Sequence, residues 1–166
     1  MLNCAMPIHE AGKPRRSVAV RPLDRKEIAA AYPLARMLAP ALDLAAWQRF
    51  AGAILDGAPT EERGILAAAG EGGYLCGLLI YRVVHDLRHG RVLTADHVLA
   101  LDIVDRKPVA AALLSALEEL SEALGCDALH TGFDTPQETL KALWEGAGHQ
   151  VERTLLCKTP SATARR

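Results

Sequence analysis

Residues 94 to 120 read TADHVLALDIVDRKPVAAALLSALEEL, and this stretch decides the fold. It begins with an extended apolar run over residues 98 to 101 and continues through a short charged turn over residues 102 to 107. The apolar residues that follow are spaced as on one face of an α-helix: Val109, Leu113, Leu114, Leu117 and Leu120. Where a strand leads through a tight loop into a helix, the backbone N–H groups of the first helical turn point out of the helix toward any ligand bound at the loop. Such a helix N-terminus attracts phosphate and other anions.

The composition predicts one domain without an affinity for nucleic acid or membrane. The chain has 166 residues, enough for a sizeable core, and half of them are apolar. Nineteen basic residues nearly balance twenty acidic ones, so no net charge favours either surface. Only 4% of the residues are aromatic, which argues against base stacking. No apolar run reaches membrane-spanning length without a charge. We therefore expect a cytoplasmic protein.

The cysteines and histidines do not indicate a metal site. The four cysteines have neither CxxC nor Cys/His ligand spacing: Cys4, Cys76, Cys126 and Cys157. We expect reduced thiols and no metal cofactor. His130 is expected to be a packed or edge residue of a strand, and His85 and His89, which flank a turn, are expected to be solvated.

The rest of the chain predicts an α/β (α+β) fold. Strands are indicated at residues 17–23, 63–69, 74–85, 91–101, 128–133 and 150–158. Helices are indicated after Asp24 and after Asp43, both good N-caps, and at residues 108–124 and 136–145. Glu27 forms a partial capping box, and Pro33 should kink or break the first helix. The order β-α-α-β-β-β-α-β-α-β argues for a mixed, mostly antiparallel sheet with helices on both faces. Residues 1–16 are expected to be a disordered leader, 17–158 a single domain, and 159–166 a frayed tail.

Residues 96 to 114 resemble strand four, the pyrophosphate loop and the following helix of the GCN5-related N-acetyltransferases, without a gap. The element order extends this resemblance to about residues 17–158. The family implies that strands four and five splay apart, and that the pantetheine arm of an acyl-CoA pairs with the exposed edge of strand four. Backbone groups of Leu99 and Leu101 would then face the pantetheine. Acetyl-CoA or another acyl-CoA is the implied co-substrate and an amine the implied acceptor, and we allow for a homodimer.

The pyrophosphate loop, which the resemblance places at Asp105 to Ala111, departs from the family pattern. The family has Arg or Gln, two variable residues, Gly, one variable residue, then Gly or Ala. The six positions here are Asp105-Arg106-Lys107-Pro108-Val109-Ala110, of which only Ala110 fits. Pro108 has no N–H to donate, and Asp105 brings a negative charge that Arg106 and Lys107 could offset. Asp105 and Pro108 also fit an ordinary N-cap and first-turn proline, so both interpretations stay open.

The resemblance also implies positions for catalytic groups. A carboxylate early on strand four is matched by Asp96, with His97 beside it. Because neighbours on a strand point to opposite faces, at most one of them is expected to face the cleft. Trp144 takes the place of the family's tyrosine acid, although an indole N–H does not titrate near neutral pH. Gln137 takes the place of an asparagine. Asp96 could equally be a solvated strand-end carboxylate, and Trp144 a residue packed under the last strand.

Two functions follow from these residues. The first is an acyl-CoA-dependent N-acetyltransferase that acts on an unidentified amine, either a small molecule or a protein terminus. The apolar first two helices, with Leu38, Leu42, Trp47 and Phe50, favour a protein terminus or hydrophobic amine over a sugar. The alternative is a non-catalytic acyl-CoA-responsive or partner-binding module with the same fold, because fold does not settle function.

Overall fold

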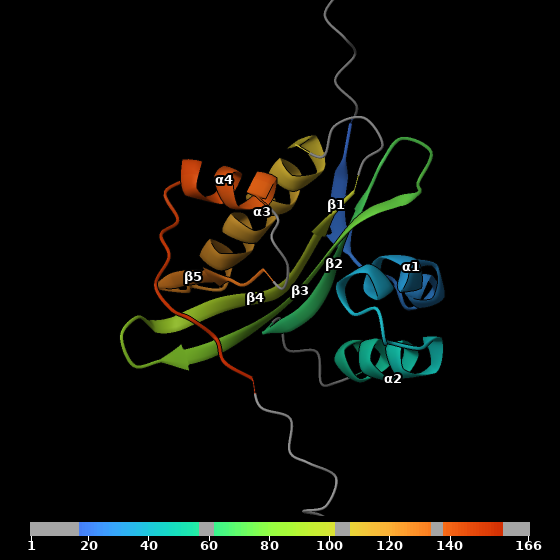
Figure 1. Cartoon of the computed structure of the whole chain (residues 1–166), viewed down its shortest axis with the longest axis horizontal. Helices are drawn as coiled ribbons and strands as arrows, with labels where there is room; N and C mark the ends of the chain where they lie inside the picture. Colours follow the sequence, from blue (N-terminus) through green and yellow to red (C-terminus); the bar gives the residue numbers. More distant parts are fainter. Residues whose placement is uncertain (1–16, 57–61, 102–106, 134–137, 158–166) are drawn as a thin grey trace, which may run out of the picture.

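The computed structural model describes residues 17–56, 62–101, 107–133 and 138–157 (Figure 1). The expected leader and tail lie outside these ranges. The strands are β1 (Ala19–Pro22), β2 (Arg63–Ala69), β3 (Leu75–Asp86), β4 (Gly90–Ala100) and β5 (Ala128–Thr131). The helices are α1 (Ile28–Leu38), α2 (Leu44–Leu55), α3 (Lys107–Ala123) and α4 (Glu138–Gly146), and a 3-10 turn (Arg25–Glu27) precedes α1.

The strands form one sheet in the order β1-β2-β3-β4-β5. All neighbours are antiparallel except β4 and β5, which are parallel. Helices α3 and α4 cover one face, and α1 and α2 pack on the other (Figure 1). The mixed, mostly antiparallel sheet with helices on both faces is therefore confirmed. Among the described residues, no helix is long and apolar enough to cross a membrane.

Side-chain caps begin the first two helices as the sequence predicts. The Asp24 carboxylate accepts from the Lys26 N–H at 2.9 Å, and the Asp24 N–H donates to Glu27 at 3.2 Å, which completes the capping box. The Asp43 carboxylate accepts from the Ala46 N–H at 2.6 Å. Helix α1 continues through Pro33 without a break, so a break there is not observed.

Helix α3 lies close against the sheet because the strand beneath it carries a glycine. A Cβ at Gly77 would meet the Ala68 Cβ at 2.9 Å and side-chain atoms of Leu113 and Val109 at 3.0 Å. Only a residue without a side chain fits at this distance. This packing holds the start of α3 beside the first residues of β3 and the last residues of β4.

The prediction of a last strand at residues 150–158 is wrong for the part of it that the structure describes, residues 150–157. Residues 150–157 form no strand, and Leu155 and Leu156 are each 90% exposed. Instead, Arg153 contacts Asp86 at 2.7 Å and Glu152 contacts His89 at 2.9 Å, which ties the segment to the β3–β4 hairpin. The neighbouring edge strand β5 has only four residues and offers few ladder hydrogen bonds to a further strand.

Candidate functional site

Strands β4 and β5 separate partway along β4. Their pairing runs from Val92 opposite Ala128 to Ala95 opposite Thr131, and the Gly132 N–H then donates to the Ala95 carbonyl at 2.8 Å. Strand β4 continues to Ala100, whereas β5 ends at Thr131. Within the described ranges, no pairing with β5 extends past residue 95. An extended chain that pairs with β4 would enter at this separation of the two strands.

A β-bulge lies at the same point of β4. Ile80 pairs with His97 and Tyr81 pairs with Ala95, so Asp96 is the extra residue. An extra residue reverses which neighbour each backbone group faces. Before the bulge, the Ala95 carbonyl accepts a hydrogen bond from the β5 side. After it, the Leu101 N–H donates to the Cys76 carbonyl on the β3 side at 2.7 Å.

This reversal corrects the backbone positions that the sequence predicted. Leu101, and by alternation Leu99, direct their backbone groups to β3, so they do not face the side on which β5 separates. Val98 and Ala100 direct theirs to the other side. The one-residue error arises because a bulge cannot be detected from the apolar run alone.

The bulge also places Asp96 and His97 on the same face of the sheet. His97 lines a pocket against α1 and α2, together with Ile80. The Asp96 carboxylate accepts from Arg82 Nη2 at 2.9 Å, and Arg82 shares a face with Ile80 because the two are two positions apart on β3. Of the two residues, His97 lines the pocket and Asp96 does not, so the expectation that at most one of them faces the cleft is not contradicted. Arg82 was not predicted as a site residue, although a charge within an apolar strand could have indicated it.

The pocket beside His97 is apolar and has a volume of about 140 Å³. Its wall comes from α1, α2, the connection between them, and the sheet: Ala35, Leu38, Ala39, Leu42, Trp47, Phe50, Ile80 and His97. Trp47 is fixed by a hydrogen bond from its indole N–H to the Ile28 carbonyl at 2.6 Å, whereas Phe50 is 45% exposed. His97 is the titratable side chain among the lining residues.

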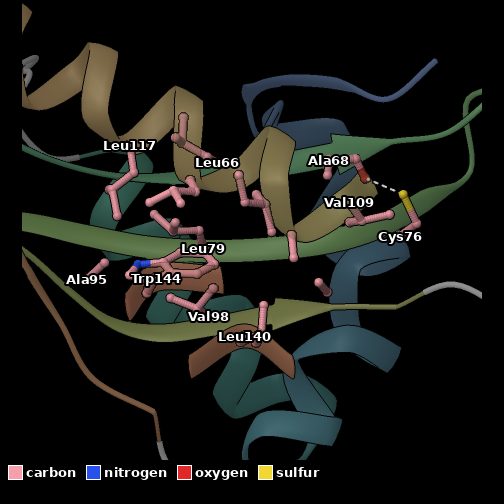
Figure 2. Close-up of a cluster of buried hydrophobic side chains, with 14 of the residues drawn as sticks. Leu66, Ala68, Cys76, Leu79, Ala95, Val98, Val109, Leu117, Leu140 and Trp144 are labelled. Carbon is pink, nitrogen blue, oxygen red and sulfur yellow. Dashed lines mark hydrogen bonds between the residues drawn. The ribbon is translucent and has the colours of Figure 1, made fainter. Parts of the chain in front are cut away.

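Trp144 lies in the core and does not face an open cleft (Figure 2). Its side chain is 2% exposed, and its indole N–H donates to the Thr131 hydroxyl at 3.1 Å. The ring also makes an edge contact with Phe133, with ring centroids 5.6 Å apart. This geometry favours a packed core residue over a group that acts on a leaving thiolate. The ring packs from α4 onto β5, and not under a sixth strand as the sequence suggested.

The described part of the predicted phosphate loop begins at Lys107, the first residue of α3. Pro108 and Ala111 are exposed, whereas Val109 and Ala110 are buried against the sheet. Asp105, Arg106 and Gln137 lie outside the described residues, so their predicted contacts remain predictions. Pro108 in the first turn of α3 agrees with the ordinary interpretation of that proline.

No protein-family model matches the chain, and no curated protein matches its sequence. Solved structures do match its fold. An aminoglycoside N-acetyltransferase, AAC(6')-Iy in complex with CoA, has a TM-score of 0.69 at 17% identity, over 87% of this chain and 95% of that one. A ribosomal-protein-alanine N-acetyltransferase from Brucella melitensis biovar Abortus 2308 has a TM-score of 0.67 at 19% identity, over 86% and 99%. A transcriptional regulator from Bacillus halodurans C-125 has a TM-score of 0.69 at 14% identity, over 86% and 99%. The chain therefore has the acetyltransferase fold that the sequence resemblance implied.

Proposed function

We propose that this protein is an acyl-CoA-dependent N-acetyltransferase that transfers an acetyl group to an amine. The observation that carries the proposal is the separation of β5 from β4 beyond Ala95, next to a pocket that His97 helps to line. An extended pantetheine arm would enter where the two strands part and lie along β4, as an added strand would. The thioester at its end would then lie near the bulge at Asp96.

The side chains at the bulge suit the proton transfer that this reaction requires. The amine nitrogen attacks the thioester carbonyl, the N–C bond forms, the C–S bond breaks, and the amine proton goes to a base. The Asp96 carboxylate is already paired with Arg82, whereas His97 lines the pocket. We therefore assign the base to His97, since imidazole is the side chain whose charge changes near neutral pH. Asp96 and Arg82 would position the bulged segment.

No side-chain acid is required for the leaving group. A coenzyme A thiol resembles the thiol of free cysteine, whose pKa is about 8.5, and so it can depart as a thiolate without full protonation. This agrees with the burial of Trp144, whose indole N–H is already bonded to Thr131.

The pocket limits the acceptor to an amine with an apolar group. Its volume of about 140 Å³ is close to that of cavities known to hold benzene, which are ~150 Å³. A ring or a branched aliphatic side chain fits such a space, whereas a polar sugar would lose hydrogen bonds to water there. The acceptor class is therefore a hydrophobic amine or a protein terminus with an apolar first residue.

The experiment is an assay of thiol release from acetyl-CoA with peptides that differ in their first residue, with hydrophobic amines, and with an aminoglycoside. We expect His97→Gln to lower kcat/KM about a hundredfold, which is typical of a lost general base. His85→Gln, at the far end of β3, is the control and should leave activity unchanged. A His97→Gln variant with full activity would contradict the assignment of the base.

The alternative is a non-catalytic acyl-CoA-responsive or partner-binding module. One observation favours it: a protein named as a transcriptional regulator shares the fold. Binding of acetyl-CoA without turnover of any amine in the panel would support this function over the enzyme.

A further inference from the structure

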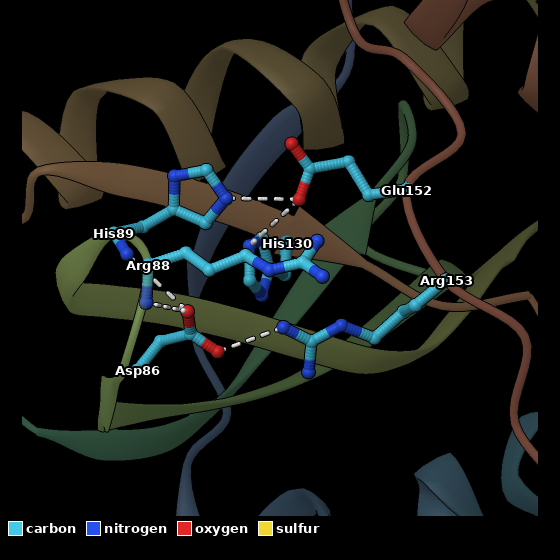
Figure 3. A network of polar contacts seen from close by, with 6 residues as sticks. All are labelled: Asp86, Arg88, His89, His130, Glu152 and Arg153. Atoms are coloured by element: carbon cyan, nitrogen blue, oxygen red, sulfur yellow. Dashed lines mark hydrogen bonds and ion pairs between the residues drawn. The ribbon is translucent and has the colours of Figure 1, made fainter.

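Three potential metal ligands from separate parts of the chain meet at one end of the sheet (Figure 3). His89 lies in the turn between β3 and β4, His130 lies on β5, and Glu152 lies in the segment after α4. His89 Nε2 is 2.9 Å from Glu152 Oε2, and His130 Nε2 is 3.9 Å from the same oxygen. One ligand atom from each residue lies within 4.8 Å of the other two.

We propose that His89, His130 and Glu152 bind a divalent transition-metal ion, with zinc as the best fit. Two imidazoles and one carboxylate are a donor set that zinc commonly takes, whereas magnesium and calcium prefer oxygen ligands only. Zinc bonds of about 2.0–2.2 Å in a tetrahedron imply ligand atoms ~3.3 Å apart. The distances of 2.9 and 3.9 Å lie on either side of that value.

The surrounding contacts hold the ligands in place. Asp86 accepts hydrogen bonds from the backbone N–H groups of Arg88 at 2.8 Å and His89 at 3.3 Å, which fixes the turn. Its other carboxylate oxygen accepts from Arg153 at 2.7 Å, which fixes the residue next to Glu152. Such supporting contacts are typical of metal sites, because they orient the ligands before the ion arrives.

The imidazoles must be neutral to bind a metal. Burial, followed by the positive charges of Arg153 and His89, lowers the pKa of His130, while Asp86 and Glu152 act in the opposite direction. The net effect favours the neutral ring.

The site would have a structural role. It would join the segment after α4 to the β3–β4 hairpin and to β5, where no strand pairing holds the described part of that segment. The hairpin end of the sheet lies away from α1 and α2 (Figure 1), so the site is separate from the proposed acyl-transfer pocket. Three protein ligands leave a fourth position for water.

The test uses the full chain without an affinity tag, freed of metal by a chelator and titrated with zinc chloride in a calorimeter. We expect one zinc per chain and a higher melting temperature when zinc is present. Cobalt chloride should give visible absorption typical of a tetrahedral site with nitrogen and oxygen ligands. A strong thiolate-to-cobalt band would instead indicate cysteine ligands and overturn the assignment.

The variants His89→Gln, His130→Gln and Glu152→Gln identify the ligands. Each should weaken zinc binding by at least ~10–100-fold, the loss that even an outer supporting residue causes. His85→Gln, an exposed histidine on the same hairpin, should bind as the unaltered chain does. Melting temperatures without metal establish that each variant is folded. Unchanged affinity in all three variants would overturn the proposal.

A second measurement follows the segment itself. Trypsin cuts after arginine, and Arg153 follows Glu152 directly. Zinc should slow cleavage after Arg153 in the unaltered chain and not in Glu152→Gln. If millimolar zinc neither binds nor slows cleavage, the three residues form only a hydrogen-bonded network and the proposal fails.

Discussion

The indole of Trp144 contacts Thr131 through its N–H and Phe133 through its ring, and it is almost fully buried. Trp144→Phe removes the hydrogen bond and leaves the Thr131 hydroxyl without this partner, which should cost about 1–2 kcal/mol of unfolding free energy. Trp144→Ala should cost about 3–5 kcal/mol, because it also leaves a cavity. Urea unfolding measures both. If Trp144→Tyr instead raised acetyl transfer several-fold at constant coenzyme A affinity, the ring would belong to a thiol site.

The resemblance could not distinguish these two roles for Trp144. A large apolar side chain at that position fits both a cleft and a core, and the deciding partner, Thr131, is on another strand. Asp96 and His97 were predicted as site residues, but their shared face depends on a bulge. A bulge is set by pairing with β3, which no local pattern reports. The residues His89, His130 and Glu152 meet only through the tertiary fold.

At the scale of elements, a substitution at Gly77 tests the contact between α3 and the sheet. Gly77→Ala would place a Cβ 2.9 Å from Ala68 and 3.0 Å from Val109 and Leu113, so a neighbour must move. We expect a loss of about 1–3 kcal/mol in unfolding free energy, as in other overpacked cores. Gly146→Ala, at the end of α4, is the matched control because nothing lies within 4 Å of its added Cβ. Equal stability of the two variants would mean that α3 can shift without cost.

The turn before α1 gives a prediction about pH. A hydrogen bond from Arg21 lowers the pKa of Glu27 to about 2. The folded value lies below the unfolded value of about 4.3, so the contribution to stability is complete above that pH and is lost as the pH falls toward the folded value. Glu27→Gln keeps a residue suited to the capping box and removes the charge. Urea unfolding should show the variant less stable at pH 7, with the difference vanishing between about pH 4.3 and 2.

Arg21→Gln is the control for this prediction. In that background, the loss of stability caused by Glu27→Gln should depend much less on pH. A loss that stays constant from pH 7 to acid in the unaltered background would mean that the Arg21–Glu27 pair, whose atoms are 2.6 Å apart, contributes nothing to the folded state.

Elements with strong local signals were predicted well. Strand β2 spans the short apolar run, bounded by a turn at residues 71–73, that the sequence indicated, and Asp24 and Asp43 cap the helices as their side chains suggest. The segment after α4 also had a strand pattern, yet it forms polar contacts with the β3–β4 hairpin instead. Strand formation needs an adjacent edge of sufficient length, and that requirement is not encoded in the segment itself.

At the scale of the whole molecule, acyl-CoA binding should stabilise the complete fold, because the proposed site spans β4 and the start of α3. At a concentration a hundred times its Kd, a ligand that binds only the folded state adds about 2.7 kcal/mol. For a domain of this size we expect the melting temperature to rise by ~5–10 °C. Calorimetric scans with and without acetyl-CoA measure this rise in melting temperature.

The positive charge of Lys107, at the start of α3, should determine how salt affects the rise in melting temperature that acyl-CoA causes. Lys107 is the first residue of the helix, where a cation and the positive end of the helix dipole would both attract phosphate. Lys107→Ala should reduce the shift, and the reduction should be larger in dilute buffer than in salt of ~1 M, where the Debye length falls to ~3 Å. Glu138→Gln, at the start of α4, is a control of similar exposure that should leave the shift unchanged. A chain whose melting temperature does not respond to millimolar acetyl-CoA or coenzyme A would contradict both the acetyltransferase and the acyl-CoA-responsive module, since each requires the cofactor to bind, and would leave a partner-binding module as the function.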